Sequence, residues 1–238
     1  MRSVAQQSVD ELGGQASLLV RQRRDHAKLD VLLDRLAATS GPEQDETLRA
    51  LYRLVFPHAF AEESVVWPVV RATLPDGQEL TVRNEQEHQE INELVARLER
   101  TPHGDPGRAA LIDRVSALLR QDARDEEDLI LPRLQAALDG PRLRRLGRTW
   151  ELVRRTAPTR PHPVVARRPP GNVVAALPLS LLDRTRDGLE RAGRRAPGPL
   201  PGLADRSSRL LGGLAGALEH VPPLTRGEDP STHSGRTG

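Results

Sequence analysis

Apolar residues recur at steps of three and four through four long segments of this 238-residue chain. Such spacing places the apolar side chains on one face of a helix, which must pack against other helices to be buried. No stretch alternates apolar and polar residues as a strand would. The four segments are residues 9–38, 43–73, 81–100 and 108–138. Because their connections are short and contain Pro and Gly, the sequence predicts an all-α fold, an up-down-up-down four-helix bundle.

The chain changes character near residue 155. A turn leads into a shorter basic helix over residues 142–155, which is expected to pack onto the bundle as a fifth helix. All five aromatic residues lie before residue 151, and the following segment is rich in Pro, Gly and Arg. We therefore predict a folded unit over residues 1–155 and a largely irregular tail over residues 156–238, with at most two short helices and no core of its own. The histidines expected to be exposed are His103, His162, His220 and His233.

The amino-acid composition excludes several classes of functional site. Without a cysteine, the chain has no disulfide, iron–sulfur cluster or thiolate zinc site, which leaves His, Asp and Glu as metal ligands. The N-terminus lacks the apolar run of a secretion signal, and the longest apolar run is too short to span a bilayer, so a cytoplasmic protein is expected. The pI of about 9.8 accompanies a formal net charge of only +2, because few groups titrate below the range of arginine. No nucleic-acid partner is therefore expected.

Two polar residues interrupt the apolar face of the second segment. His58 and Glu62 stand between Val55 and Val65 at the same three- and four-residue steps, so both are expected to point inward. A His/Glu pair four residues apart is more often a solvated surface pair. The apolar residues on either side argue against that interpretation here.

The fourth segment is interrupted in the same manner, because the two segments form an internal repeat. The sequence HAFAEESVVWP at residues 58–68 aligns without a gap with DARDEEDLILP at residues 122–132. Asp122 and Glu126 therefore take the places of the histidine and the glutamate, and Leu129 is expected to continue the apolar face.

The first and third segments each place one histidine, His26 and His88, on their apolar face. Three histidines and three carboxylates are thus expected to face one core. Buried carboxylates without partners cost several kcal/mol each, a cost that a pair of divalent or trivalent cations would offset. Imidazole and carboxylate ligands without thiolate favour iron or manganese over structural zinc. The predicted metal ligands are His26, His58, Glu62, His88, Asp122 and Glu126.

Residues 15–138 resemble the hemerythrin-like HHE cation-binding domain, whose pattern over four helices is His, His-x-x-x-Glu, His and His-x-x-x-Glu. The matching positions are His26, His58, Glu62, His88 and Glu126. The Glu-Glu-x-x-x-x-Pro endings of both repeats are similar as well, and the following LRRLGRTWELVRRTAPTRPHP looks like bacterial members of the family. The chain departs from the pattern at Asp122, where the family usually has histidine.

The resemblance implies a non-haem di-iron centre, bridged by carboxylates, with an open position for dioxygen, nitric oxide or peroxide. Glu62 and Glu126 would bridge or cap the ions, the histidines would be terminal ligands, and Asp122 would replace one imidazole. Aspartate stabilises the oxidised metal, which counts against reversible oxygen carriage. Metal-bound histidines also need a partner for the second ring nitrogen. The candidates for that role are Asp25, Asp30, Glu63 and Glu127.

These features favour a protein that binds, senses or scavenges a small ligand over a substrate-specific enzyme, since the sequence has no nucleotide loop or nucleophile triad. If the protein is an enzyme, a di-iron oxidoreductase acting on oxygen or peroxide is expected. One alternative is an iron-handling protein whose metal is structural and whose basic tail recruits a protein partner. The other is a metal-free helical adaptor with buried polar networks.

Overall fold

The computed structural model describes residues 1–195, 200–226 and 229–232. Every regular element within these residues is helical, which confirms the all-α prediction. None of the helices described is long and apolar enough to cross a membrane. The predicted exposure of His233 falls outside the described residues.

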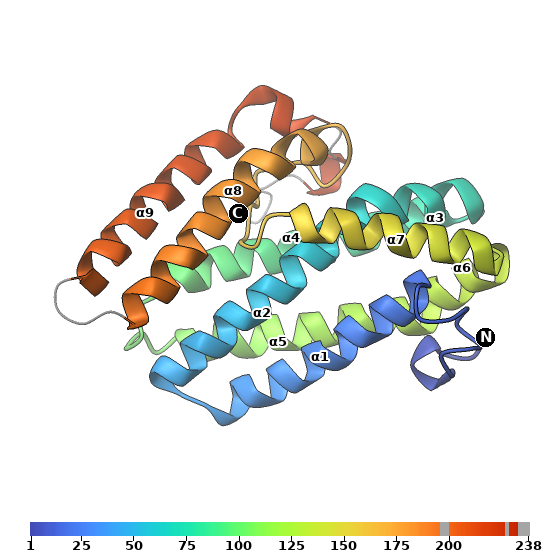
Figure 1. Ribbon diagram of the computed structural model, residues 1–238, viewed down its shortest axis with the longest axis horizontal. Helices are drawn as coiled ribbons and strands as arrows, with labels where there is room; N and C mark the ends of the chain where they lie inside the picture. The colour runs from blue at the N-terminus through green and yellow to red at the C-terminus, as the bar shows by residue number, and fades with distance from the viewer. Residues whose placement is uncertain (196–199, 227–228, 233–238) are drawn as a thin grey trace.

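The first part of the chain forms a bundle of long helices (Figure 1). Its elements are η1 (Val4–Gln6), α1 (Leu18–Ala38), α2 (Gly41–Ala61), η2 (Glu62–Val66), α3 (Trp67–Thr73), α4 (Gly77–Arg100), α5 (Arg108–Asp125), η3 (Glu126–Ile130) and α6 (Leu131–Ala137). α1 packs against α2 and α5, and α4 packs against α3 and α5. α7 (Gly140–Thr156) lies against α1 and α2, as expected of an appended helix.

α1 begins at Leu18, later than the periodicity predicts. Gly13 and Gly14 have φ angles of +88° and +87°, a left-handed conformation that glycine adopts without strain and that a right-handed helix cannot contain. The chain before them still contributes to the core. Val4 and Leu12 are fully buried in a small apolar cluster with residues of α1, α6 and α7.

Two larger apolar clusters fill the bundle. Leu51 and Val115 belong to one of them, and Trp67 and Trp150 belong to the other. The predicted metal ligands of each long segment are flanked in the sequence by residues of the two clusters. A residue of one cluster precedes them, and a residue of the other cluster follows them. The polar side chains therefore form a layer across the bundle, with apolar packing on both sides.

The short elements η2 and η3 are π-helical turns, and each moves the buried face of its segment by one residue. Val66 is fully buried while Val65 is only partly buried. Likewise Ile130 is buried, whereas Leu129 is 47% exposed, so the prediction that Leu129 points inward is wrong. The physical reason is that one extra residue in a turn rotates all following side chains by about 100° around the helix axis.

The tail is largely helical in the part that the structure describes, so the prediction of a largely irregular tail is wrong. α8 (Gly171–Arg195) and α9 (Leu200–Glu219) pack against each other and are followed by η4 (Pro222–Thr225) and η5 (Pro230–Thr232). They have a small core of their own, formed by Val165, Ala175, Leu179, Ala215 and Leu224. Most prolines of the tail lie outside the interiors of these two helices, which leaves both amphipathic stretches free to fold. The domain boundary at residue 155 stays a prediction.

Buried polar contacts hold the tail against α4. The main-chain N–H of His162 donates to Asn92 Oδ1 at 3.0 Å, and its ring lies 3.0 Å from Asp183 and 2.9 Å from Glu219. Arg160 makes ion pairs with both α4 and α8. Because His162 is only 7% exposed, its predicted exposure is wrong.

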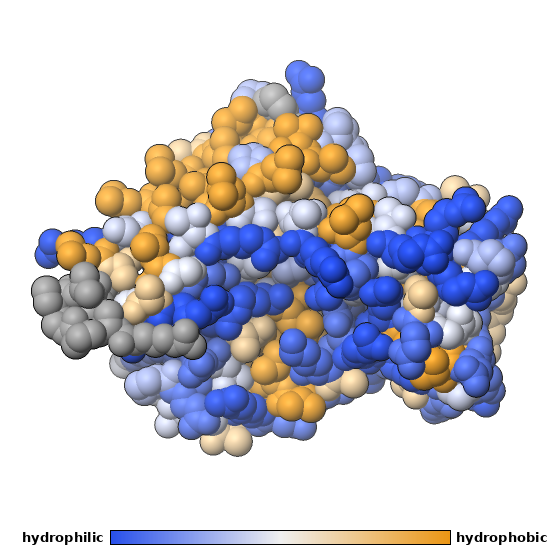
Figure 2. All heavy atoms as spheres, viewed as in Figure 1, coloured by the Kyte–Doolittle hydropathy of each residue, from blue (hydrophilic) through white to orange (hydrophobic). Residues whose placement is uncertain are grey.

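The outer faces of α8 and α9 are apolar, and Figure 2 shows them as an orange region over these helices. The large exposed residues there are Val173, Val174, Leu177, Leu181, Leu203, Leu210 and Leu214. A band of hydrophilic side chains crosses the same view between this region and the bundle. At the surface, polar side chains thus separate the apolar face of α8 and α9 from the bundle.

Candidate metal centre

Both repeats place their first glutamate at the start of a π-helical turn. The main-chain N–H of Trp67 donates to the carbonyl of Glu62, and that of Leu131 donates to the carbonyl of Glu126, five residues back rather than four. The next residue is a proline in both repeats, and it has no N–H with which to continue the α-helical ladder. The wider turn therefore follows from the repeated Glu-Glu-x-x-x-x-Pro sequence. π turns of this kind are frequent at functional sites.

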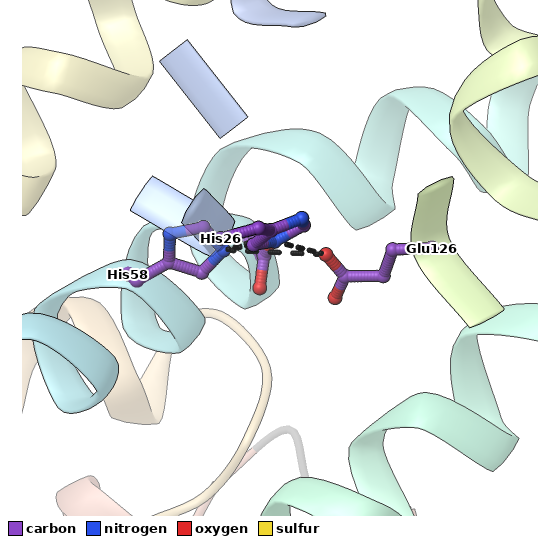
Figure 3. A group of neighbouring side chains, drawn as sticks. His26, His58 and Glu126 are labelled. Atoms are coloured by element: carbon purple, nitrogen blue, oxygen red, sulfur yellow. Dashed lines mark hydrogen bonds and ion pairs between the residues drawn. The ribbon is translucent and has the colours of Figure 1, made fainter. Parts of the chain in front are cut away.

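Ligand atoms from α1, α2, η2 and η3 converge at one point between the helices. His58 Nε2 lies 2.9 Å from Glu62 Oε1, and His26 Nε2 lies 3.2 Å from Glu126 Oε2. The two imidazole Nε2 atoms are 3.3 Å apart. Figure 3 shows the two rings beside each other, with the carboxylate of Glu126 directed toward them. One ligand atom from each of the four residues lies within 4.8 Å of the others, so a single ion could be held by all four.

A second group is formed by His88 of α4, Asp122 of α5 and Glu126. His88 Nε2 lies 3.6 Å from Asp122 Oδ1 and 3.8 Å from Glu62 Oε2. Glu126 belongs to both groups, and Glu62 faces a histidine of each. The structure thus brings all six predicted ligands together and places the two glutamates between the groups.

The second ring nitrogen of each histidine faces a carboxylate outside the ligand groups. Nδ1 lies 3.0 Å from Glu127 in His26, 3.4 Å from Asp25 in His58 and 2.9 Å from Glu63 in His88. A proton held at Nδ1 by such a partner leaves Nε2 free to bind an ion and fixes the orientation of the ring. The fourth candidate is wrong, because Asp30 pairs with Arg120 at the surface at 2.7 Å.

The buried charged groups of the polar layer shift one another's pKa values. Burial, reinforced by the charge of Glu126, raises the pKa of Glu62 to about 7. Burial also raises the pKa of Asp122, and Glu126 contributes again. Burial alone would lower the pKa of His88, but Asp122 and Glu63 outweigh it and hold that pKa well above its ordinary value. A cation bound between these groups would favour ionised acids and free Nε2 atoms at the same time.

Four buried ligand atoms make no well-aligned hydrogen bond among the residues that the structure describes, although Glu62 Oε1 and Glu126 Oε2 each lie within 3.2 Å of an imidazole Nε2. They are Glu62 Oε1, Glu62 Oε2, Glu126 Oε2 and His88 Nε2. Leaving a buried polar atom unsatisfied costs about 1–3 kcal/mol, and more if the group is charged. Imidazole nitrogens and carboxylate oxygens without thiolate are a donor set that suits iron or manganese. The residues present therefore fit a metal centre.

A small cavity borders the polar layer. Its volume is about 30 Å³, more than the roughly 10–15 Å³ that a single water molecule needs. Its polar lining includes His26, His58, His88 and Asp122. The apolar lining comes mainly from Leu29, Leu54, Val55, Phe56, Ile91 and Leu119. A space of this size beside the ligand atoms can hold a ligand of two or three atoms.

Sequence reasoning misses two residues beside the centre. Asn84 Nδ2 donates to Asp122 Oδ1 at 2.7 Å and to Glu126 Oε1 at 3.3 Å. Its position four residues before the histidine of α4 is the signal that could have found it. Trp150 of α7 packs at a right angle to His58, with ring centroids 5.2 Å apart. No local sequence pattern connects this tryptophan with the centre.

The tail and α7 contact the carboxylates that hold the histidines. An Nη atom of Arg167 lies 3.7 Å from Glu63, and one of Arg154 lies 3.5 Å from Asp25. Asn92 Nδ2 donates to the carbonyl of His88 at 2.9 Å. Residues outside the four long segments therefore complete the surroundings of the centre.

The fold and the site define a helical protein with a paired histidine and carboxylate centre. Residues 18–134 match the family model described as the hemerythrin HHE cation binding domain, so a domain of this family covers all six predicted ligands. An uncharacterized hemerythrin-like protein of Schizosaccharomyces pombe (strain 972 / ATCC 24843) is 25% identical over 172 residues, which are 71% of this chain and 84% of that protein. No solved structure matches. Because this relative is a yeast protein, the expected bacterial source stays a prediction.

Proposed function

We propose that the protein is a non-haem di-iron protein that binds, senses or scavenges dioxygen or a related small ligand such as nitric oxide or peroxide. In this proposal the four long segments run up, down, up and down and enclose two iron ions, with manganese as the alternative metal. One observation carries the proposal. Imidazole and carboxylate groups from four segments converge, and several of their buried ligand atoms make no well-aligned hydrogen bond within the described residues.

Each predicted ligand has a role that its position supports. The two histidines of the first group are terminal ligands, and His88 and Asp122 are terminal ligands in the second group. Glu62 and Glu126 face both groups and would be the carboxylates that hold both ions. The three outer carboxylates hold a proton at Nδ1 of each histidine and keep each Nε2 directed inward.

The bound metal would supply a redox-active pair of ions with an open position for a small ligand. The cavity beside the ligand atoms has mainly apolar walls, which include Leu29, Phe56 and Ile91, and it would give a small ligand a place next to the ions. This place for a small ligand supports a protein that binds one.

Asp122 makes the two groups chemically unlike. It supplies an anionic oxygen where the first group supplies a second imidazole, and Asn84 donates a hydrogen bond to that carboxylate. A harder, charged ligand favours the oxidised ion. We therefore infer that sensing or scavenging suits this centre better than reversible oxygen carriage.

Metal content and optical spectra test the proposal. Protein loaded anaerobically with ferrous iron should hold two irons per chain and gain a charge-transfer absorption band on exposure to air. His58→Ala and Glu62→Ala should each lose iron and the band. The control His103→Ala removes an exposed histidine outside the centre and should keep both. Far-UV circular dichroism of each variant shows whether the helices are retained.

The alternatives predict different results. Metal that stabilises the fold without any spectral response to oxygen, nitric oxide or peroxide would favour a structural site and a partner-binding tail. A well-folded protein that takes up no iron under these conditions would favour the metal-free adaptor and would leave the buried acids to be explained as a polar network.

A further inference from the structure

A larger cleft lies between the bundle and the C-terminal helices. Its volume is about 740 Å³, within the range of about 300–1,000 Å³ that small-molecule sites occupy. Residues of α2, α8 and α9, the end of α4 and the start of α5 line it, and none of them is a predicted metal ligand. On α2, Arg49 of the cleft precedes His58 of the metal centre by two and a half turns, about 14 Å along the helix axis.

The cleft has a large excess of positive charge. Seven arginines and three carboxylates line it, an excess of four charges in a chain whose formal net charge is +2. The carboxylates already have partners: Asp45 lies 3.2 Å from Arg108, and Glu99 and Glu190 lie 2.9 and 2.8 Å from Arg160. The lining arginines without an ion pair within the described residues are Arg49, Arg100, Arg186, Arg194 and Arg209.

Arg49 and Arg186 are partly buried, whereas Arg100, Arg194 and Arg209 are exposed. The Nε atoms of Arg49 and Arg186 are buried and have no hydrogen-bond partner in the described part of the chain. Burial lowers the pKa of Arg49, and the like charge of Arg194 on α8 lowers it further, while Asp45 and Glu190 act in the opposite direction and only partly offset this. Buried donors and gathered like charges both disfavour the folded state unless an anion joins them.

We propose that this cleft binds a small molecule that carries several phosphate groups, such as a nucleoside triphosphate or inorganic triphosphate. The planar guanidinium group donates two parallel hydrogen bonds to phosphate oxygens, and three or four negative charges match the excess in the cleft. Leu48, Tyr52 and Leu98 supply the apolar part of the lining and are at most 5% exposed, so the contact that a base or sugar can make with them is small. The site is separate from the di-iron function and does not depend on it.

Isothermal titration calorimetry of the full chain with inorganic triphosphate and with ATP tests this proposal. The double variant Arg49→Gln/Arg194→Gln should bind triphosphate at least tenfold more weakly than the unmodified protein. The control Arg114→Gln removes an exposed arginine outside the cleft and should bind as the unmodified protein does. Because phosphates also bind iron, the titrations are repeated with Glu62→Ala, which should keep its affinity for triphosphate.

The outcomes distinguish inorganic triphosphate from a nucleoside triphosphate as the ligand. Equal affinity for triphosphate and ATP identifies the phosphate chain as the recognised group, and tighter binding of ATP adds a contact of the nucleoside with the apolar lining. No binding at millimolar concentrations, or the same affinity in the double variant, would overturn the proposal. Tighter binding of a short DNA duplex than of either compound would overturn it in favour of a nucleic-acid surface. If the double variant does not fold, Arg209→Gln at an exposed position gives the same comparison.

Discussion

The substitution His162→Gln should loosen the C-terminal helices at low pH and hardly affect them at high pH. The ring of His162 is buried between Asp183 of α8 and Glu219 of α9. Burial alone would lower its pKa, but the two carboxylates outweigh burial and raise the pKa to about 9. A protonated His162 therefore joins both helices to the segment that leads from the bundle.

The pH dependence follows from the difference between the folded and unfolded pKa values of His162. In the unfolded chain the ring titrates near 6.5. Below that pH its contribution to stability is complete, and it falls as the pH rises from the unfolded value to the folded value of about 9. The difference corresponds to on the order of 3 kcal/mol, close to the cost of about 3–5 kcal/mol for breaking a buried ion pair.

Urea unfolding near the two ends of this pH range measures the effect. Both tryptophans lie in α3 and α7, so their fluorescence follows the bundle, while far-UV circular dichroism follows every helix. We expect His162→Gln to lose on the order of 3 kcal/mol in the circular dichroism transition at about pH 6 and less than about 1 kcal/mol at about pH 9.5. His220→Gln, at an exposed histidine, should change neither. An equal loss at both pH values, or none at the lower one, would refute the reasoning.

Three further predictions concern the packing and the centre. A Cβ at Gly147 would lie 2.4 Å from the carbonyl oxygen of Ala16, so Gly147→Ala should push α7 away from the start of α1. We expect the free energy of unfolding to fall by about 1–3 kcal/mol or more, which a lower midpoint of thermal unfolding would show. Glu63→Gln should weaken metal binding about 10–100-fold in a competition titration, because it removes the carboxylate from Nδ1 of His88, whereas the exposed Glu90→Gln should not. Asp122→His should raise the reduction potential of the bound metal in a redox titration, because it replaces an anionic oxygen by a neutral imidazole; an unchanged potential would mean that Asp122 is not a ligand.

The positions in the polar layer were predictable from the sequence because they depend on local spacing. Helical periodicity places His26, His58 and His88 on apolar faces, and the internal repeat adds Asp122 and Glu126. Three of the four carboxylates proposed to hold the second ring nitrogen also lie where expected. The two π turns interrupt the α-helical period, so periodicity alone does not predict them, although a proline stands five residues after both Glu-Glu pairs.

The tail could not be predicted from local sequence. His162 stands between two prolines, which indicates an exposed, extended segment. Its burial depends on Asp183 and Glu219, carboxylates that come from helices far along the chain. In the sequence, Asn92 is likewise one more polar residue of α4. Only the folded structure shows that its side chain accepts a hydrogen bond from the main-chain N–H of His162. Contacts between segments distant in sequence leave no periodic signal.

The same contacts make the tail part of the environment of the metal centre. Asn92 accepts the N–H of His162 through one atom of its side chain and donates to the carbonyl of His88 through the other. Arg167 approaches Glu63, which in turn faces Nδ1 of His88. The alignment with the yeast relative is longer than residues 18–134, so similarity extends beyond the cation-binding domain itself. Because the orientation of a metal-bound histidine depends on its partners, any displacement of the tail from α4 acts directly on the second group of ligands.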